Sequence, residues 1–399
     1  MLPTLCSHGH AIIASPYPPE DGGSCILMRE LLAQFDPLSF TLVTRAPYRK
    51  SGPEEGRRGA RYDLISTIGA IRGLNRWWHY LQLPLACARL ARLTRRLDAR
   101  VIVGVYPTLE LLALAQRVAA SEKLPLVAYF HDTLREGLDG TRWAKPAIRL
   151  QKSVFEEASG LLVMSQGMSE LYRRKYGMEA EPIEHIYTEA IPNLPPAKVT
   201  IRQAFWAGSI YGININSVAR VSRALEAIRT SFLLATSSPS VRLAALGVGG
   251  PHVRQTYFSK RTDYLTELQK QGLLVLALDW PDESSIHEDE LATIFPTKTP
   301  EYLAAGRPIL VHCPEHYFLA KFVQRHRCGL VVTERSPDAL MQACARLLDS
   351  GEEARHFSIR ALQAARLFSP GLIVPRFKAV VETAASLGWR PKHAGRKVS

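Results

Sequence analysis

The sequence has no closely spaced cysteine pairs. Its six cysteines lie far apart along 399 residues, and no C-x-x-C segment occurs. Zinc ribbons, thioredoxin-like sites and dense disulfide frameworks are therefore excluded, and a reducing compartment is the simpler expectation. G-x-x-x-x-G-K-[ST], G-x-S-x-G and H-E-x-x-H segments are also missing. Their absence argues against P-loop ATPases, α/β-hydrolases and zincin proteases.

An Asp-x-Asp sequence is absent as well, so we expect no carboxylate clamp for a divalent metal and no bound metal. Any phosphate would then be bound by backbone amides and cationic side chains. The only Rossmann-like glycine fragment, Gly247, Gly249 and Gly250, is incomplete and lies late in the chain. A plain loop explains this fragment better than a dinucleotide site does.

Long apolar runs are missing too. The most apolar window, residues 101–120, is interrupted by Glu110, Gln116 and Arg117. It falls short of the roughly 18 apolar residues of a membrane-spanning helix. The first residues lack a basic n-region and contain two histidines, so we read no secretion signal. We expect a cytoplasmic protein.

Charge is unevenly distributed. The formal net charge is +13, and residues 45–100 hold 13 Lys and Arg against four acidic residues. Within this segment, Leu83, Leu90 and Leu97 repeat every seven residues, whereas Arg89, Arg92 and Arg96 occupy another face, after Trp77 and Trp78. A solvated basic helix with a core-directed leucine stripe is one interpretation. The other is attachment to anionic lipid, with both tryptophans at the level of the headgroups.

Short apolar runs alternate with helix-like segments throughout the chain. The expected strands lie in residues 10–16, 40–45, 99–107, 125–132, 160–165 and 184–192, and then 202–208, 231–237, 273–280, 292–296, 308–314 and 329–334. This alternation is typical of parallel sheets built from βαβ units. We therefore predict an α/β protein with two domains.

The proline-rich stretch near the midpoint reads as an extended linker. The predicted N-terminal domain covers residues 1–193, the linker 194–200 and the C-terminal domain 201–370. A C-terminal helix follows at residues 371–388, and it can return to the N-terminal domain. Residues 389–399 form a basic tail.

Three places carry candidate ligand chemistry. Gly22 and Gly23 lie in a turn that opens a helix, where backbone amides favour an anion, although a plain tight turn is the simple alternative. His131 and Asp132 directly follow an apolar run, at the strand end where ligands collect in parallel sheets. A structural, hydrogen-bonded histidine is the alternative for His131.

The third place is the phrase TIFPTKTPEYLAAGRPILV, residues 293–311. Pro300 suits a first helical turn that Thr299 can cap. The helix amides, the charge of Lys298 and the hydroxyls of Thr297 and Thr299 would form a cradle for a diphosphate. Glu301 would accept hydrogen bonds from vicinal hydroxyls, as a ribose presents them. A capped helix with a surface lysine is the simple alternative.

These segments resemble family 4 glycosyltransferases of the GT-B fold. The P-P-x-x-G-G turn is similar to their N-terminal glycine-rich loop, the H-D strand end to the histidine that faces the sugar, and residues 158–178 to their A-D-x-V-x-V-S stretch. The phrase P-T-K-x-x-E-Y-L-A-A-G-x-P-I-L resembles their donor-site segment, in which Glu301 corresponds to the second Glu of an E-x7-E motif. The resemblance spans residues 11 to about 380.

The resemblance implies two Rossmann-like, doubly wound domains that face each other across a cleft. It implies a retaining, metal-independent transfer of a sugar from a nucleoside diphosphate sugar to a glycan or lipid-linked acceptor hydroxyl, without a cofactor. Lys298, Glu301 and His131 would be the catalytic residues. The pathway would be cell-surface polysaccharide or glycolipid assembly, peripheral on the inner face of a membrane.

The sequence departs from the family pattern at two positions. Thr293 replaces the first glutamate, and no Arg follows Gly208. Ser209, Tyr211 and Asn214 are the candidate substitutes as neutral donors. Two alternatives to a transferase remain at this point, a GT-B-like nucleotide-sugar epimerase and a non-catalytic basic nucleic-acid-binding protein. We expect no nucleic-acid partner.

Overall fold

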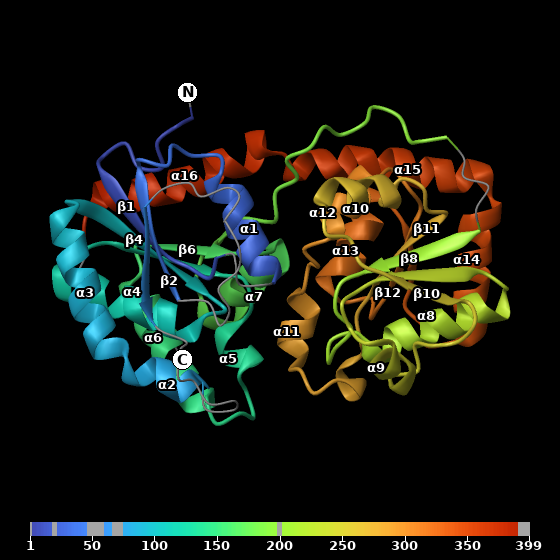
Figure 1. The fold of residues 1–399 in the computed structure, drawn as a ribbon, viewed down its shortest axis with the longest axis horizontal. Helices are drawn as coiled ribbons and strands as arrows, with labels where there is room; N and C mark the ends of the chain where they lie inside the picture. Colours follow the sequence, from blue (N-terminus) through green and yellow to red (C-terminus); the bar gives the residue numbers. More distant parts are fainter. Residues whose placement is uncertain (1, 18–21, 46–59, 66–74, 198–201, 390–399) are drawn as a thin grey trace. The chain divides into compact units, whose positions relative to one another are not determined.

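A computed structural model describes residues 2–17, 22–45, 60–65, 75–197 and 202–389. Contacts between Cα atoms divide the chain into two units (Figure 1). Unit 1 contains residues 1–186 and 370–399, and unit 2 contains residues 187–369. The predicted boundary at 193/194 lies seven residues after this division. Residue 187 belongs to unit 2, where the backbone N–H of Tyr187 donates to the Phe368 carbonyl at 2.8 Å.

Unit 1 is built on a parallel sheet of seven strands in the order β3-β2-β1-β4-β5-β6-β7. The strands are β1 (His10–Ala14), β2 (Phe40–Arg45), β3 (Ala60–Ile65), β4 (Ala99–Tyr106), β5 (Leu126–Phe130), β6 (Gly160–Val163) and β7 (Glu181–Pro182). The helices are α1 (Gly23–Leu32), α2 (Asn75–Leu81), α3 (Leu83–Arg96), α4 (Leu109–Glu122), α5 (Leu134–Gly137), α6 (Ala144–Glu157), α7 (Gln166–Tyr176) and α16 (Pro370–Leu387). The strand order reverses between β1 and β4, so the switch point of this sheet lies there.

Unit 2 is built on a parallel sheet of six strands in the order β10-β9-β8-β11-β12-β13. The strands are β8 (Gln203–Ala207), β9 (Ser231–Ala235), β10 (Val253–Thr256), β11 (Leu273–Ala277), β12 (Ile309–His312) and β13 (Leu330–Val332). The helices are α8 (Ile215–Ala227), α9 (Ser240–Ala245), α10 (Arg261–Leu268), α11 (Glu288–Thr293), α12 (Thr299–Ala304), α13 (Phe318–His326), α14 (Pro337–Asp349) and α15 (Gly351–Ala365), with 3-10 turns at Pro281–Glu283 and Arg366–Phe368. The switch point of this sheet lies between β8 and β11.

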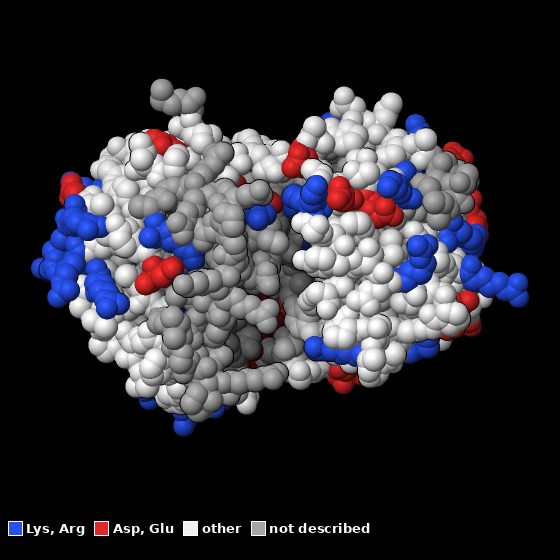
Figure 2. Space-filling model, viewed as in Figure 1, with Lys and Arg blue, Asp and Glu red and all other residues white. Residues whose placement is uncertain are grey.

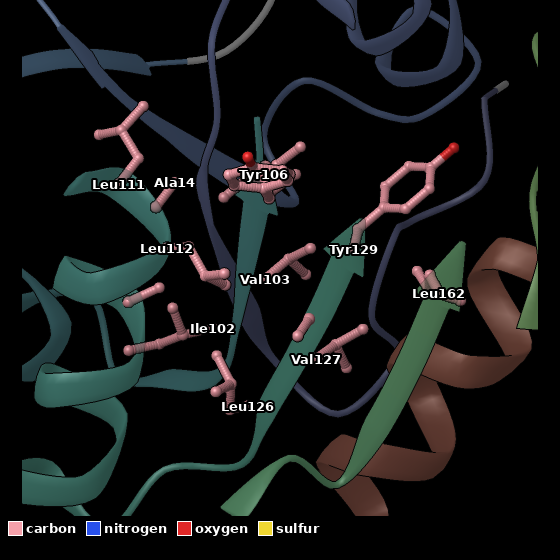
Figure 3. Packing of buried hydrophobic residues seen from close by; sticks show 14 of the residues in the cluster. Ala14, Ile102, Val103, Tyr106, Leu111, Leu112, Leu126, Val127, Tyr129 and Leu162 are labelled. Carbon is pink, nitrogen blue, oxygen red and sulfur yellow. The ribbon is translucent and has the colours of Figure 1, made fainter. Parts of the chain in front are cut away.

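Apolar runs form the central strands because both faces of a parallel sheet are covered by helices. In unit 1, Leu112 on α4 packs against Ile102 on β4 (Figure 3). A Cβ at Gly104 would lie 2.7 Å from the Cβ of Ala115, so only glycine allows α4 to approach β4 this closely. The core of unit 1 therefore fixes the carboxyl ends of β4 and β5, where candidate site residues lie.

Two expected strands are wrong. In residues 184–192 the chain is irregular, and the edge strand β7 is only Glu181–Pro182. Arg376 of α16 forms ion pairs with Glu181 and Glu184 there, so side chains rather than a sheet ladder hold this segment. Residues 292–296 also form no strand, because Phe295 packs against the rings of Phe318, Phe322 and Phe368 in a loop. Two short strands, β3 and β10, were not predicted because their sequences are polar.

Of the predicted segments, residues 198–200 of the linker and 390–399 of the basic tail lie outside the described residues. The predicted C-terminal helix corresponds to α16, which belongs to unit 1.

Candidate functional site

The carboxyl edge of the unit 2 sheet carries the largest set of predicted site residues. Strand β8 ends at Ala207, and Gly208 follows with φ of 102° in an exposed position. A Cβ at Gly208 would lie 4.0 Å from the Lys298 ammonium nitrogen. A residue with a side chain would be strained at this φ, so the position favours glycine. The backbone beside the Lys298 ammonium is therefore not covered by a side chain at this position. This place adjoins the β8/β11 switch point, where ligands bind in open α/β sheets.

Lys298 is held against β8. Its Nζ donates to the Ala207 carbonyl at 2.5 Å and lies 3.2 Å from the ring centroid of Trp206. Burial holds the pKa of the Lys298 ammonium well below its ordinary value, and the Glu301 carboxylate opposes this shift. The ammonium has three protons, of which the Ala207 carbonyl takes one. The remaining capacity suits an anion that approaches from Gly208.

Glu301 lies in the first turn of α12 and is 8% exposed. Arg261 of α10 donates to its Oε1 at 2.6 Å, and the Tyr264 hydroxyl donates to its Oε2 at 2.9 Å. The carboxylate is thus fixed in one orientation, and each oxygen keeps a further lone pair for a ligand hydroxyl. Burial and the Glu301 charge raise the pKa of Tyr264 well above its ordinary value, so its hydroxyl remains a donor.

Arg261, like Tyr264, is a residue of this cluster that the sequence did not reveal. It lies 40 residues before Glu301 in the chain and directly after the unpredicted region of β10. A basic pair, Lys260 and Arg261, at the start of a helix-like segment was the available signal. The structure adds a guanidinium to the edge of the sheet where the family arginine after Gly208 is missing.

The threonines of the predicted cradle occupy different environments. Thr299 was expected to cap α12, but Lys298 occupies the N-cap and no side chain caps the helix. Thr299 is fully buried within the first turn, and its hydroxyl has no partner among the described residues. Thr297 is half-buried in the loop before it. The capping prediction is therefore wrong, since α12 begins at Thr299 itself, one residue earlier than it would if Thr299 were the N-cap.

The loop after β8 uses Asn214 to hold its own shape. The Asn214 side chain accepts from the Tyr211 backbone N–H at 3.0 Å and donates to the Ser209 carbonyl at 3.3 Å. Asn214 is buried, whereas Ser209 and Tyr211 are exposed. Of the three candidate neutral donors, Asn214 is thus used within the loop, and the other two lie at the surface.

The N-terminus of α8 is already occupied. The Asp279 carboxylate accepts from the backbone N–H groups of Ser217 at 2.7 Å and Asn216 at 3.1 Å. Helix N-termini after a first strand favour anions, and here a protein carboxylate supplies the negative charge. These two backbone N–H groups are therefore already paired within the protein.

Thr293 ends α11 at the position of the missing glutamate. Its hydroxyl donates to the carbonyls of Asp289 and Glu290 at 3.2 and 3.0 Å, and the residue is buried. Thr293 is therefore the last residue of α11 and presents no carboxylate at that position.

In unit 1, His131 follows β5 and is 4% exposed. Neither ring nitrogen has a hydrogen-bond partner among the described residues, and the ring packs edge-on against Tyr129 with centroids 4.2 Å apart. Burial, with a smaller contribution from the charge of His185, lowers the pKa of His131 to about 3. The neutral imidazole thus offers one donor and one acceptor to a ligand.

The glycine turn of unit 1 opens α1 as predicted. Gly22 is the N-cap with φ of 133°, a region that only glycine adopts readily, and Gly23 is the first helical residue. No side chain caps α1. Residues 18–21 of this turn lie outside the described residues.

The basic segment forms α2 and α3 in unit 1. Leu83 and Leu90 are fully buried, whereas Trp77 and Trp78 are 49% and 38% exposed. Arg89, Arg92 and Arg96 are exposed. Figure 2 shows Lys and Arg gathered over the region of α3 at the left edge of the view. Residues 46–59 and 66–74, which hold part of the charge excess, lie outside the described residues.

Comparison with known proteins shows which family part of the chain matches. Residues 26–188 match the model of the glycosyl transferase 4-like domain. The chain therefore contains a glycosyl transferase 4-like domain. The matched region of the transferase lies within unit 1 except for its last two residues, 187 and 188, and it includes His131 and the α2–α3 segment. No curated protein matches the transferase significantly in sequence.

Solved structures share its two-unit fold. Sucrose-phosphate synthase from Thermosynechococcus elongatus superposes with a TM-score of 0.70 at 15% identity, covering 94% of the transferase and 99% of that chain. HepE from Anabaena, solved in complex with UDP-glucose, gives 0.68 at 12% identity, covering 94% and 99%. TarM from S. aureus, in complex with UDP, gives 0.55 at 13% identity, covering 74% and 59%. These likenesses confirm the GT-B fold.

The family decides between the enzyme classes considered for the sequence. A glycosyltransferase domain favours a transferase over an epimerase and over a non-catalytic nucleic-acid binder. Among the described residues, none of the helices combines the length and apolar character needed to span a bilayer. In that same part of the chain, no three His, Cys, Asp or Glu side chains converge in a metal-binding arrangement.

Proposed function

We propose that the transferase moves a sugar from a nucleoside diphosphate sugar to an acceptor hydroxyl with retention of configuration and without a metal. The observation that carries this proposal is the cluster of Lys298, Glu301, Arg261 and Tyr264 beside Gly208. It combines cations for a diphosphate with an oriented carboxylate for a ribose. The UDP-glucose complex of HepE supports a nucleotide-sugar donor for this fold.

In the proposed reaction, the Lys298 ammonium neutralises charge on the departing diphosphate while an oxocarbenium-like centre develops. Glu301, held by Arg261 and Tyr264, fixes the nucleoside by accepting hydrogen bonds from its hydroxyls. As the bond between the acceptor oxygen and the sugar forms and the bond to the diphosphate breaks, the departing diphosphate takes the proton of the acceptor hydroxyl. We propose that neutral His131 in unit 1 orients the sugar or the acceptor through its ring nitrogens.

Thermal stabilisation by nucleotides tests the donor proposal. A ligand that binds only the folded state raises the unfolding temperature in proportion to RT ln(1 + [L]/Kd). We expect one of UDP, GDP, ADP and CDP to stabilise the protein at micromolar to millimolar concentration, and the Glu301→Ala variant to lose this stabilisation. Equal response of the wild type and the variant would refute the site. Steeply salt-dependent binding to DNA or RNA without any nucleotide response would favour nucleic-acid binding instead.

The proposed acceptor is a glycan or a lipid-linked glycan, and the proposed place of action is the inner face of a membrane, in polysaccharide or glycolipid assembly. Support comes from the exposed Trp77 and Trp78 beside the exposed arginines of α3. Tryptophans suit the headgroup region, and each nearby Lys or Arg contributes about 1 kcal/mol on anionic lipid.

A further inference from the structure

Unit 2 contains a cavity of about 410 Å³ at the edge of the sheet opposite to the proposed donor site. It is lined by residues that directly precede three strands, Arg202 before β8, Gly272 before β11 and Pro308 before β12. The donor cluster lies at the carboxyl ends of these strands. Five residues of β8 span roughly 15 Å at about 3.3 Å per residue, so one ligand of nucleotide-sugar type cannot fill both places from one face.

The cavity contains a buried cation, Arg307, that pairs with no carboxylate of the described residues. Arg307 is 7% exposed, and all its observed hydrogen bonds go to neutral carbonyl oxygens, those of Gln269 and Ala197. Burial lowers the pKa of its guanidinium, because desolvation disfavours the charged form. Buried charges in proteins are normally paired with an opposite charge. An anion in the cavity would supply that missing charge.

Two further arginines line the same cavity. Arg202 forms an ion pair with Asp349, and Arg355 has neither a hydrogen bond nor an ion pair among the described residues. The lining thus carries three guanidiniums against one carboxylate. Gly351, the first residue of the 15-residue helix α15, also lines the cavity, and no side chain caps this helix.

The first turn of α15 also carries acidic residues. Glu352 is exposed and does not line the cavity. Glu353 is held by Arg346, which donates to it at 2.6 Å. The backbone amides at the start of α15 therefore remain available to an anion.

The rest of the lining suits an organic group. Pro195, Pro196 and Leu347 contribute apolar surface. Gln271 also lines the cavity, is fully buried, and its Oε1 has no partner among the described residues, so a ligand hydroxyl would satisfy it. We propose that this cavity binds an organic phosphate, with the phosphate at Arg307, Arg355 and the α15 N-terminus and the organic part against the prolines. The volume is in the range of small-molecule sites.

A binding experiment with the full chain tests this site at constant ionic strength. Glucose 6-phosphate, inorganic phosphate and glucose serve as probes in thermal-shift and calorimetric titrations. We expect saturable binding of glucose 6-phosphate, at least fivefold weaker binding of inorganic phosphate, and none of glucose. Arg355→Gln should weaken glucose 6-phosphate binding at least fivefold. Arg360→Gln, a charge-matched change on the same helix outside the lining, should leave it unchanged.

The Lys298→Ala variant separates this site from the donor site. Glucose 6-phosphate should bind this variant as it binds the wild type, also in the presence of saturating nucleotide. Loss of binding in Lys298→Ala would assign the probe to the donor site and overturn the proposal. Absence of binding to the wild type, equal affinity for inorganic phosphate, or unchanged binding by Arg355→Gln would overturn it too.

Discussion

Glu301 and Lys298 are three residues apart, and each is fixed by a different partner. Glu301 is oriented by Arg261 and Tyr264, and Lys298 by the Ala207 carbonyl and the Trp206 ring. These contacts keep the carboxylate and the ammonium from simply neutralising each other. The ammonium and the carboxylate are thus kept as two separate charges for a ligand. A surface lysine beside a glutamate would instead pair with it.

Loss of either charge should slow transfer. We expect Glu301→Ala and Lys298→Ala each to reduce kcat/KM at least about tenfold, close to 1.4 kcal/mol of transition-state stabilisation. Steady-state kinetics with the donor identified by the nucleotide panel measures this effect.

Two controls accompany these kinetics. Lys321→Ala removes an exposed lysine from α13 and should keep full activity. Circular dichroism should show the fold of all variants unchanged. If Glu301→Ala and Lys298→Ala both turn over at the wild-type rate, the donor-site assignment is wrong.

Protonation of His312 makes the free energy of unfolding depend on pH. It is fully buried at the end of β12, where Nδ1 pairs with the Val332 carbonyl and Nε2 accepts from Arg220 at 3.1 Å. Burial lowers its pKa to about 4. In the unfolded chain the His312 imidazole binds a proton near pH 6.5, whereas in the folded protein it does so only near pH 4. The free energy of unfolding therefore falls as the pH drops through this window.

Urea unfolding at pH 7 and pH 5 measures this linkage. We expect His312 to account for a loss of about 2 kcal/mol in the free energy of unfolding between the two pH values, and His312→Gln to remove that part of the loss. Replacing the exposed His8 by Gln should leave the pH dependence as in the wild type. Identical pH dependence of the wild type and His312→Gln would contradict the assignment.

At the scale of elements, α1 depends on one backbone conformation. Gly22 has φ of 133° and ψ of 157°, and a Cβ there would meet no atom of the described residues within 4 Å. Steric contact therefore plays no part, and a substitution would act through backbone strain alone. This separates the requirement for glycine from any requirement for space.

Gly22→Ala should destabilise the protein by about 1–3 kcal/mol, the strain of this region for a non-glycine residue. Gly371→Ala is the matched control, because it also has open space but lies in α16 without a positive φ. The control should be neutral or slightly stabilising. Denaturant unfolding decides, and equal stability of both variants would show that the turn relaxes freely.

The α2–α3 segment combines a buried leucine stripe with exposed tryptophans and arginines. The leucines pack as a core face, whereas Trp77 and Trp78 do not become core. Trp77 instead contacts the Trp143 ring, with centroids 4.9 Å apart. The burial of the leucine stripe confirms that one helix face is structural, and attachment of the exposed face to anionic lipid stays a prediction.

Liposome co-sedimentation tests the open face. We expect the wild type to pellet with anionic but not neutral vesicles at low salt, and the Arg89, Arg92 and Arg96→Gln triple variant to stay in solution. Raising the salt should release the wild type, because screening shortens the reach of the charges.

A variant of equal charge loss, with Arg223, Arg242 and Arg254 of unit 2 replaced by Gln, should still pellet. Equal pelleting by the α3 variant, or none by the wild type, would leave a solvated helix as the explanation.

At the scale of the whole molecule, the chain supplies cations rather than a carboxylate clamp. The net charge is +13 and no Asp-x-Asp sequence occurs. We expect full turnover in EDTA, because Lys298 and neighbouring amides would neutralise the diphosphate. Assays before and after chelation, with Mg²⁺ and Mn²⁺ added back, measure this. Activity that EDTA abolishes and a metal restores would contradict the proposed neutralisation.

Much of the fold followed from the sequence because parallel strands are buried on both faces and read as apolar runs. Short polar strands such as β10 lack an apolar run and were therefore missed. The apolar residues around Phe295 form such a run, but the segment is not a strand. A run of buried residues shows that a segment enters the core. It does not show whether a ladder or aromatic packing holds the segment there.

The sequence by itself determined the two α/β halves, the family resemblance, and the Lys298–Glu301 pair, because these depend on local spacing and motif. Only the tertiary structure decided that Arg261 orients Glu301, that Asp279 occupies the N-terminus of α8, and that Asn214 holds its own loop. The first two contacts join residues 40 and 62 positions apart. Local pattern carries no information on such pairs, because the order of strands in the sheet decides which loops meet at its edge.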